Sequence, residues 1–363
     1  VLVDESIFAQ TLAVMRTRAV PQGITLQVCK YNEMQFTPEV FACVVQYPNA
    51  HGSAEDYRDL AEKAHAAGCK LAVAADILSL ALLTPPGEWG ADIVFGSTQR
   101  LGTPMFYGGP SAAYFATRNE FKRNMPGRII GLSKDKYGKL CYRMALQTRE
   151  QHIKREKATS NICTSQALLA TMAGMYAVYH GPEGIRNIAK RIHSMAAFVE
   201  ASIDKMGYRQ LNKQYFDTLY ISLPFGVETE ELRTVANGKC VNLHYFENGN
   251  IGLSIDETTD IEALNTLLSI FAVAAGREWV QVDTIPETCT VCDELKRTSA
   301  YLTHEVFAKY HTETEMMRYI KRLDRKDISL THSMISLGSC TMKLNAAAEM
   351  LPLSHAGFMN IHP

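Results

Sequence analysis

The sequence has 363 residues, and its 37 Lys and Arg against 38 Asp and Glu give a formal net charge of -1 at pH 7. This balance argues against a nucleic-acid-binding protein, which would carry a basic face. Hydrophobic residues make up 47% of the chain, which excludes wholesale disorder. The length fits two domains and a linker. Nine cysteines, an odd number, indicate free thiols in a reducing compartment and no disulfide framework.

The two ends of the sequence predict a fragment cut on both sides. The chain begins at Val1, and the last residues, HAGFMNIHP, follow a segment of structured character. No basic region followed by an apolar core is present, so no signal peptide is predicted and we expect a cytoplasmic protein. Residues 161–182 lack Asp, Glu, Lys and Arg, but polar residues interrupt the apolar run. We therefore expect a buried helix at a domain junction and no membrane span.

The first part of the chain alternates between predicted helices and apolar strands. Continuous apolar runs separated by helices predict a parallel sheet that is covered on both faces. Ser53 is the predicted N-cap of the second helix, and Gly68 is its expected C-terminal glycine. The predicted helices are 4–19 and 54–67, and the predicted strands are 24–29, 41–46, 70–75 (in the centre of the sheet), 92–95 and 112–116.

The middle of the chain predicts a compact second domain with helices and antiparallel strands. Asn248-Gly249 between two apolar segments is a hairpin signal. The predicted helices are 183–206 and 257–275, the latter opened by Asp256 and Glu257, and the predicted strands lie within 216–223 and 242–255. An extended linker then leads to a charged amphipathic helix, 299–323. We expect its apolar side chains to dock on the preceding part of the chain; they are Tyr301, Val306, Met316, Met317 and Ile320.

Common nucleotide and metal motifs are absent from the sequence. It has no GxGxxG, GxxxxGK[ST] or HExxH pattern. Cys289 and Cys292 form a single CxxC, but the downstream histidines do not have the spacing of a zinc finger. No metal site is predicted.

The strongest candidate site combines Asp76, at the end of a predicted strand, with the glycine-rich loop 96–110. Ligands of open α/β sheets bind at the carboxyl ends of strands. An Asp there can keep the pyridinium nitrogen of pyridoxal phosphate (PLP) protonated, and a lysine in the loop would form the Schiff base. Gln99 and Arg100 occupy the place of that lysine, and arginine cannot lose its proton. The alternative is that Asp76 caps the following helical segment.

Three segments then resemble the PLP-dependent glycine decarboxylase family, the P-proteins of the glycine cleavage system. ADIVFGSTQRLGTPMFYGGPSAAYFA (91–116) resembles the amino-terminal half of that family, and REKATSNICTSQALLA (155–170) resembles its loop and interdomain helix. The most specific similarity is YLTHEVFAKYHTETEMMRYIKRLDRKDISLTHSMISLGSCTMKLNAAAEMLPL (301–353), which is similar to the joint between the two halves.

The resemblance implies an α/β fold of the fold-type-I PLP-transferase kind, a mostly parallel sheet sandwiched by helices with a smaller α+β domain. It implies a large domain at 1–160 and a small domain at 161–276 with its interdomain helix at 161–182. A linker and helix at 277–330 and the start of the catalytic carboxyl-terminal half at 331–363 would follow. We expect this tail to pack poorly here, or on another copy.

The resemblance also implies the activity and the site. In the family, glycine loses CO2 on PLP and its aminomethyl group passes to the lipoyl arm of the H-protein. The Schiff-base lysine lies in the carboxyl-terminal half of the family, so Asp76, Gln99 and Arg100 would be a degenerate site. We expect the fragment to be inactive alone and to bind PLP weakly or not at all. Residues predicted near the real pocket are Ser339, Cys340, Thr341, Lys343 and Asn345.

Two alternatives remain, and a homo-oligomer is expected in each case. The chain could be the stand-alone non-catalytic subunit of a two-subunit form, although the joint motif at 301–353 argues against this. It could also be another fold-type-I enzyme with an unusual lysine, but Lys70, Lys122 and Lys154 do not follow a strand in a glycine-rich loop.

Overall fold

A six-stranded sheet forms the first part of the computed structural model, which describes residues 1–125, 129–146, 155–157, 166–326 and 347–361. The strand order is β2-β1-β3-β4-β5-β6, and every neighbouring pair is parallel except β5 with β6. The strands are β1 (Leu2–Asp4), β2 (Gln27–Cys29), β3 (Ala42–Tyr47), β4 (Lys70–Ala75), β5 (Ile93–Ser97) and β6 (Ala113–Thr117). The predicted parallel sheet is confirmed, and β4 lies inside it with the predicted bounds.

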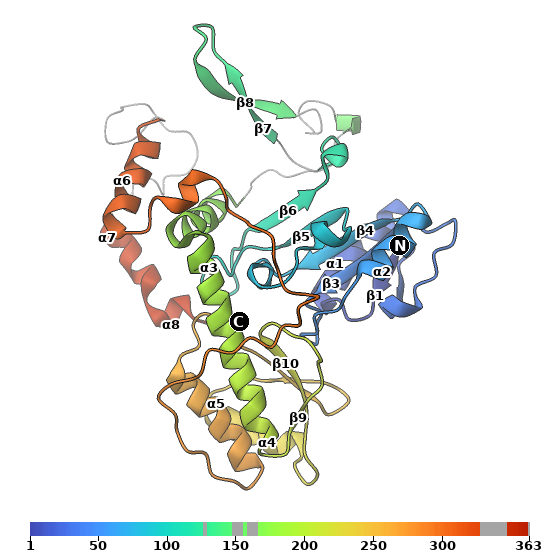
Figure 1. The fold of residues 1–363 in the computed structure, drawn as a ribbon, viewed down its shortest axis with the longest axis vertical. Helices are drawn as coiled ribbons and strands as arrows, with labels where there is room; N and C mark the ends of the chain where they lie inside the picture. Colours follow the sequence, from blue (N-terminus) through green and yellow to red (C-terminus); the bar gives the residue numbers. More distant parts are fainter. Residues whose placement is uncertain (126–128, 147–154, 158–165, 327–346, 362–363) are drawn as a thin grey trace.

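The two faces of this sheet are covered by different helices (Figure 1). Alternate residues of a strand point to opposite faces. Val3 and Val44 pack with Leu12 of α1 (Ala9–Ala19) on one face. Leu2, Cys43 and Val45 belong to the main core on the other face, together with side chains of α2 (Arg58–Ala66). We call residues 1–125 the large lobe.

The prediction of a helix over 4–19 is wrong at its start. Leu2–Asp4 is a strand between β2 and β3, and the helix begins only at Ala9. Leu2 and Val3 are fully buried. Their extended conformation is determined by pairing with strands on both sides, which outweighs the helical character of the local sequence.

The predicted start of the second helix is also wrong. Ser53 bonds to Glu55 through its hydroxyl and does not cap a helix. The helix α2 begins at Arg58, whose N–H donates to Asp56. Gly68 follows the helix with a φ of 75°, as expected for a C-terminal glycine.

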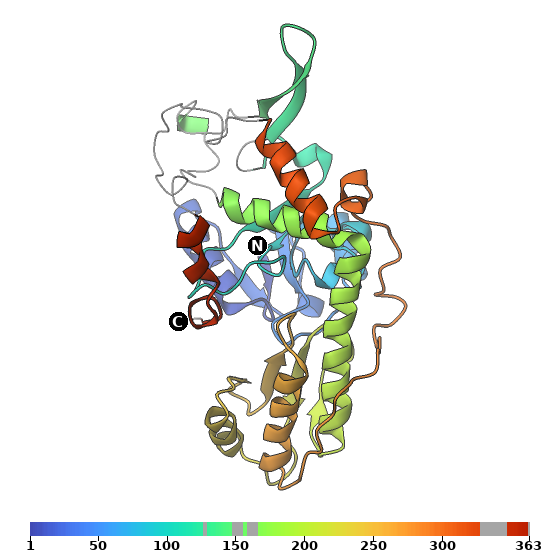
Figure 2. The same cartoon turned by 90° about the vertical axis from the view of Figure 1, so that its left-hand side faces the viewer.

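The long helix α3 (Ala167–Asp204) connects the large lobe to a second lobe and is broken at Gly181 (Figure 2). Gly181 has φ 61° and ψ -177°, a conformation available almost only to glycine, and Pro182 follows it. The break separates the two helices predicted at 161–182 and 183–206, of which residues 161–165 lie outside the described part. Within that part, no helix combines the length and apolar character needed to span a membrane.

The second lobe, residues 183–275, is built on a four-stranded antiparallel sheet; we call it the small lobe. Its strand order is β11-β12-β10-β9, and the predicted hairpin at Asn248-Gly249 joins β11 to β12. Its elements are β9 (Arg209–Gln210), β10 (Thr218–Ser222), α4 (Thr229–Gly238), β11 (His244–Tyr245), β12 (Ile251–Ser254) and α5 (Ile261–Ala274). The predicted opening of α5 at Asp256 and Glu257 is wrong, because Asp260 caps this helix and Asp256 holds the preceding turn.

The helix predicted at 299–323 is wrong in its first half. Only α6 (Glu313–Asp324) is an α-helix, and the hydroxyl of Thr312 caps it: it accepts from the N–H of Glu315 and donates to the Glu315 carboxylate. Met317 and Ile320 are 64% and 48% exposed, so the prediction that they dock is wrong. Tyr301 does contact the rest of the chain, and its hydroxyl donates to the Pro182 carbonyl.

The tail beyond α6 is described from residue 347 to residue 361. It contains α7 (Ala347–Met350) and α8 (Ala356–Met359), of which α8 is largely exposed. The N–H groups of Phe106 and Tyr107 donate to the carbonyls of Met359 and Ile361 at 3.0 and 2.7 Å, so the end of the tail lies on the glycine-rich loop. Most of the segment 335–350 lies outside the described residues, and the expectation of a poorly packed tail stays a prediction.

We predict that Gly181→Ala destabilises the protein by about 2 kcal/mol. An added Cβ would lie 2.6 Å from the backbone oxygen of Phe307, and alanine is strained at this φ. Urea denaturation measures the change. Gly174→Ala in the same helix is the control, because nothing lies within 4 Å of its Cβ position. It should stabilise by about 0.5–1 kcal/mol, and equal effects of the two substitutions would contradict the account.

Candidate functional site

A cavity of about 960 Å³ lies at the carboxyl ends of β3, β4 and β5, between the two lobes. The large lobe contributes Asp76, Gln99 and Arg100 to its lining, and the small lobe contributes Asp217 and Thr218. This is the position where ligands bind in open α/β sheets. The candidate residues of the glycine-rich loop and of β4 therefore meet, as their places at the strand ends predicted.

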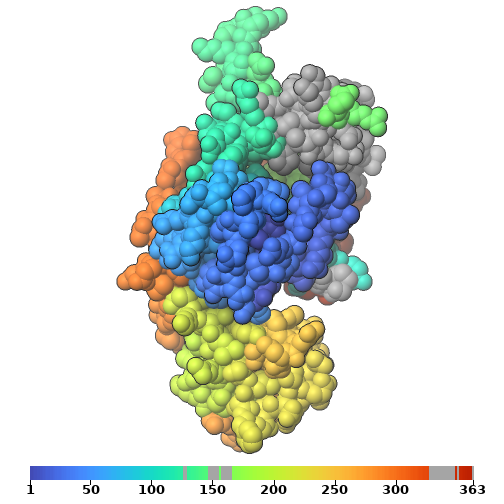
Figure 3. Space-filling view, turned by 90° about the vertical axis from the view of Figure 1, so that its right-hand side faces the viewer, coloured from blue at the N-terminus to red at the C-terminus, as the bar shows by residue number. Residues whose placement is uncertain are grey.

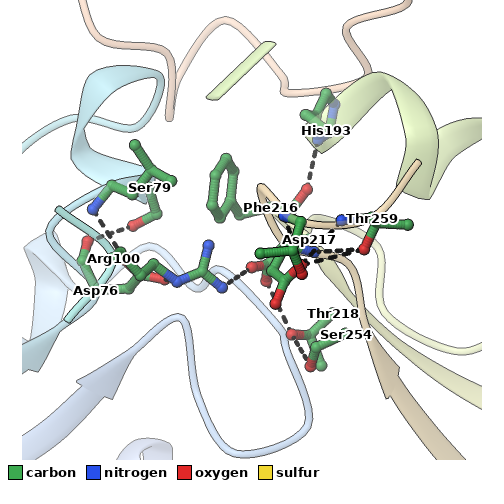
Figure 4. A network of polar contacts seen from close by, with 12 residues as sticks. Asp76, Ser79, Arg100, His193, Phe216, Asp217, Thr218, Ser254 and Thr259 are labelled. Atoms are coloured by element: carbon green, nitrogen blue, oxygen red, sulfur yellow. Dashed lines mark hydrogen bonds and ion pairs between the residues drawn. The ribbon is translucent and has the colours of Figure 1, made fainter. Parts of the chain in front are cut away.

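Arg100 bridges two carboxylates from different lobes (Figure 4). Its Nε lies 2.9 Å from Oδ2 of Asp76, and its second terminal nitrogen donates to Oδ2 of Asp217. The guanidinium also stands 5.7 Å from the centre of the Phe216 ring. A planar group that bonds through two nitrogens fixes both direction and distance, which a lysine could not do.

The charge on Arg100 is stabilised although the side chain is largely buried. Burial opposes the charged form, but the carboxylates of Asp76 and Asp217 outweigh it and raise the pKa of the guanidinium above its ordinary value. The side chain is therefore a permanent cation here. It has no free pair of electrons with which to attack a carbonyl carbon.

Asp76 has two roles at the end of β4. Its Oδ1 accepts a hydrogen bond from the N–H of Leu78 at 2.8 Å, and the Ser79 hydroxyl donates to its carbonyl oxygen. Its Oδ2 pairs with Arg100. The side chain thus holds the turn after the strand and is at the same time a partner of the loop. The alternative that Asp76 caps the following helical segment is wrong, because the N-cap of the 3-10 helix at Ser79–Ala81 is Leu78 and no side chain caps it.

Asp217 is the residue that the sequence did not indicate. Its side chain is only 5% exposed, and it follows Phe216 at the entrance to β10. Burial raises the pKa of Asp217, while the charge of Arg100 acts in the opposite direction. The Thr218 hydroxyl donates to its Oδ1 at 2.8 Å. Because 117 residues separate Asp217 from Arg100, no local pattern could have paired them.

The peptide that carries Asp217 is held in place from the side of α3. His193 is fully buried, and its Nδ1 lies 2.7 Å from the Phe216 carbonyl oxygen. Its Nε2 accepts from the N–H of Thr290 at 2.9 Å, so Nδ1 is the donor toward Phe216. Burial lowers the pKa of His193 and favours this neutral form.

The remaining candidates are less engaged or lie outside the described residues. The N–H of Gln99 donates to the Ser97 hydroxyl at 3.1 Å, and its side chain lines the cavity. Cys289 and Cys292 are free thiols. Nowhere in the described ranges do three His, Cys, Asp or Glu side chains gather as metal ligands would. Outside the described residues are Ser339, Cys340, Thr341, Lys343 and Asn345.

The described residues around this cavity do not fit covalently held PLP. None of the residues that line the cavity is a lysine. The carboxylate that would face a pyridinium nitrogen, Asp76, is already paired with Arg100. We derive no reaction step through the cofactor at this place.

Comparison with known proteins places the fold among PLP-dependent enzymes. A C-DES mutant with glycine covalently linked to its PLP cofactor has a TM-score of 0.53 and 12% identity, over 76% of this chain and 74% of that chain. This likeness concerns the fold alone. The crystal structure of a glycine decarboxylase (P-protein) of the glycine cleavage system, in inhibitor-bound form, has a TM-score of 0.69 and 33% identity, over 75% of this chain and 65% of that chain.

The family follows from the sequence comparison. The family model of the glycine cleavage system P-protein matches residues 1–271, and the chain belongs to this family. The glycine dehydrogenase (decarboxylating) of Bacteroides fragilis is 74% identical over 363 residues. That alignment covers 100% of this chain and 38% of the relative, so the chain spans little more than a third of the relative's length.

We predict that Arg100→Met destabilises the protein by about 3 kcal/mol at pH 7, because it leaves the buried carboxylate of Asp217 without its cation. The loss should shrink toward pH 4. Without Arg100 the folded-state pKa of Asp217 rises further above its unfolded value of 3.8, so the protonated carboxyl favours folding at low pH and this contribution is lost as the pH rises. Denaturant titrations from pH 4 to pH 8 measure it.

Arg118→Met is the control for this experiment. Arg118 is 45% exposed and lies 3.7 Å from Asp92, so its loss should cost at most about 1 kcal/mol. A loss at Arg100 that is no larger than at Arg118, or that is independent of pH, would show that the bridge is not the stabilising contact.

Proposed function

We propose that this chain is the non-catalytic amino-terminal half of a PLP-dependent glycine dehydrogenase (decarboxylating), joined to the start of its catalytic carboxyl-terminal half. The observation that carries the proposal is the bridge of Arg100 to Asp76 and Asp217. It puts a permanent cation where a PLP enzyme needs a lysine. The relative from Bacteroides fragilis matches the whole of this chain, and the match covers only 38% of the relative, which favours the one-chain form over a separate subunit.

The proposal for the whole protein includes its substrates and partners. Glycine would be decarboxylated on PLP, which supplies the electron sink, and the aminomethyl group would pass to the lipoyl arm of the H-protein in the bacterial cytoplasm. The catalytic lysine would belong to the carboxyl-terminal half. The residues predicted near that pocket from this chain remain Ser339, Cys340, Thr341, Lys343 and Asn345.

The role proposed for this half is structural support. Its two lobes are tied by Arg100 and by backbone contacts, such as the N–H of Ala54 to the Gln214 carbonyl at 2.9 Å. The Asn212 amide also donates to the carbonyl of His51 at 2.7 Å. Because its two lobes are held together in this way, this half would present a rigid surface to the catalytic half. The same rigidity would support contacts with further copies in a homo-oligomer.

We predict that this chain forms no specific covalent adduct with PLP. Arg100 cannot attack the aldehyde of PLP, and the cavity lining contains no lysine. Purified protein is mixed with equimolar PLP, treated with borohydride and mapped by mass spectrometry. We expect trace labelling spread over exposed lysines and no absorbance band of a bound cofactor.

The positive control is the full-length glycine dehydrogenase of Bacteroides fragilis under the same conditions, which should be labelled on one lysine outside the region that matches this chain. Stoichiometric labelling of a single lysine of this chain would overturn the proposal and favour an independent PLP enzyme.

A further inference from the structure

A second hairpin stands apart from both lobes. Among the described residues, the strands β7 (Ile129–Lys134) and β8 (Leu140–Leu146) pair only with each other, and they project beyond both lobes (Figures 1 and 3). The register places three cross-strand pairs on one face, because residues two apart along a strand point the same way. These pairs are Ile130 with Met144, Leu132 with Tyr142, and Lys134 with Leu140.

This face is apolar and exposed to an unusual extent. Leu132, Leu140 and Tyr142 are 69%, 75% and 76% exposed, and Ile130 is 58% exposed. The opposite face carries Gly131 and Ser133, which pair with Arg143 and Cys141. A two-stranded hairpin is marginally stable alone, and clustered exposed apolar side chains mark interaction sites. The hairpin therefore requires a covering surface in the complete protein.

The charged side chains of the hairpin are mostly basic. Between residues 129 and 145 the chain carries four basic side chains and one acidic side chain, whereas the whole chain has a net charge of -1. Lys134, Lys136 and Lys139 lie at or next to the turn of the hairpin, whereas Arg143 pairs with Gly131 and belongs to the opposite face. The one carboxylate, Asp135, accepts hydrogen bonds from the turn N–H groups of Tyr137 and Lys139 at 2.8 and 2.9 Å. A partner surface complementary to this hairpin would therefore be apolar at its centre and would carry carboxylates at its edge.

We propose that the apolar face of the β7–β8 hairpin docks on the carboxyl-terminal part of the full-length polypeptide, on an apolar patch rimmed by Asp and Glu. The inference rests on the proposed function. More than half of the matching relative's length lies outside the region shared with this chain, so a partner surface in that remainder would be covalently linked and have a high effective concentration. Two copies of the hairpin would bring like charges together, which disfavours a second copy as the occupant.

The test is side-chain footprinting by hydroxyl radicals on a complete polypeptide. This chain replaces its matching region in the full-length Bacteroides fragilis relative, which is 74% identical there. We expect oxidation of Tyr142 and Met144 to fall several-fold in the complete polypeptide relative to the isolated chain. Phe225 in the small lobe, which is fully exposed, is the internal reference for radical dose.

Substitutions then separate the two faces of the hairpin. Leu132→Glu with Tyr142→Glu should return oxidation of Met144 to the rate of the isolated chain, whereas Ser133→Glu on the opposite face should leave the protection intact. Equal oxidation of Tyr142 in both polypeptides would overturn the inference. Protection in the isolated chain that disappears on dilution would also overturn it, in favour of a second copy. A single labelled lysine in the PLP experiment would overturn the proposed function without changing the footprint, so the two failures are distinguishable.

Discussion

The bridge from Arg100 to Asp76 and Asp217 is the contact on which the arrangement of the two lobes depends. It joins the end of β4 to the entrance of β10 across a largely buried interface. The guanidinium bonds each of the two carboxylates through a different nitrogen, and the remaining carboxylate oxygens accept hydrogen bonds, from Leu78 on one side and Thr218 on the other, which helps to offset the cost of burial. The same bridge lies in the cavity at the carboxyl ends of the strands, where a PLP cofactor would bind in an enzyme of this fold.

Sequence patterns predicted the parts of the fold that local chemistry determines. The strand at 70–75 is a continuous apolar run, and the Asn248-Gly249 turn specifies its hairpin, so both were found. The strand at Leu2–Asp4 was missed because its conformation comes from neighbours on both sides. The sequence analysis did not predict the hairpin formed by β7 and β8. Within the described residues this hairpin belongs to neither of the two larger sheets, so it is not one of the buried apolar strands that the sequence patterns identified.

The candidate site, like the fold, was only partly predictable from the sequence. Asp76 and Arg100 could be brought together from the sequence because both follow strands of one parallel sheet. Asp217 could not, because its position depends on the packing of one lobe against the other and on His193 beneath it. The most informative observation in the sequence was that the glycine-rich loop 96–110 has no lysine. The chain belongs to the P-protein family, and we propose that the catalytic lysine lies in the part of the polypeptide outside this chain. In our account, this half supports chemistry that belongs to the rest of the polypeptide.

The most direct measurement of this account is a double-mutant cycle between Arg100 and Asp217. The free energy of unfolding is measured for the wild type, Arg100→Met, Asp217→Asn and the double variant at pH 7. If the bridge holds the lobes together, the coupling energy should be about 2 kcal/mol, and the double variant should be more stable than Arg100→Met alone. A coupling energy below about 0.5 kcal/mol, as found for exposed ion pairs, would contradict it.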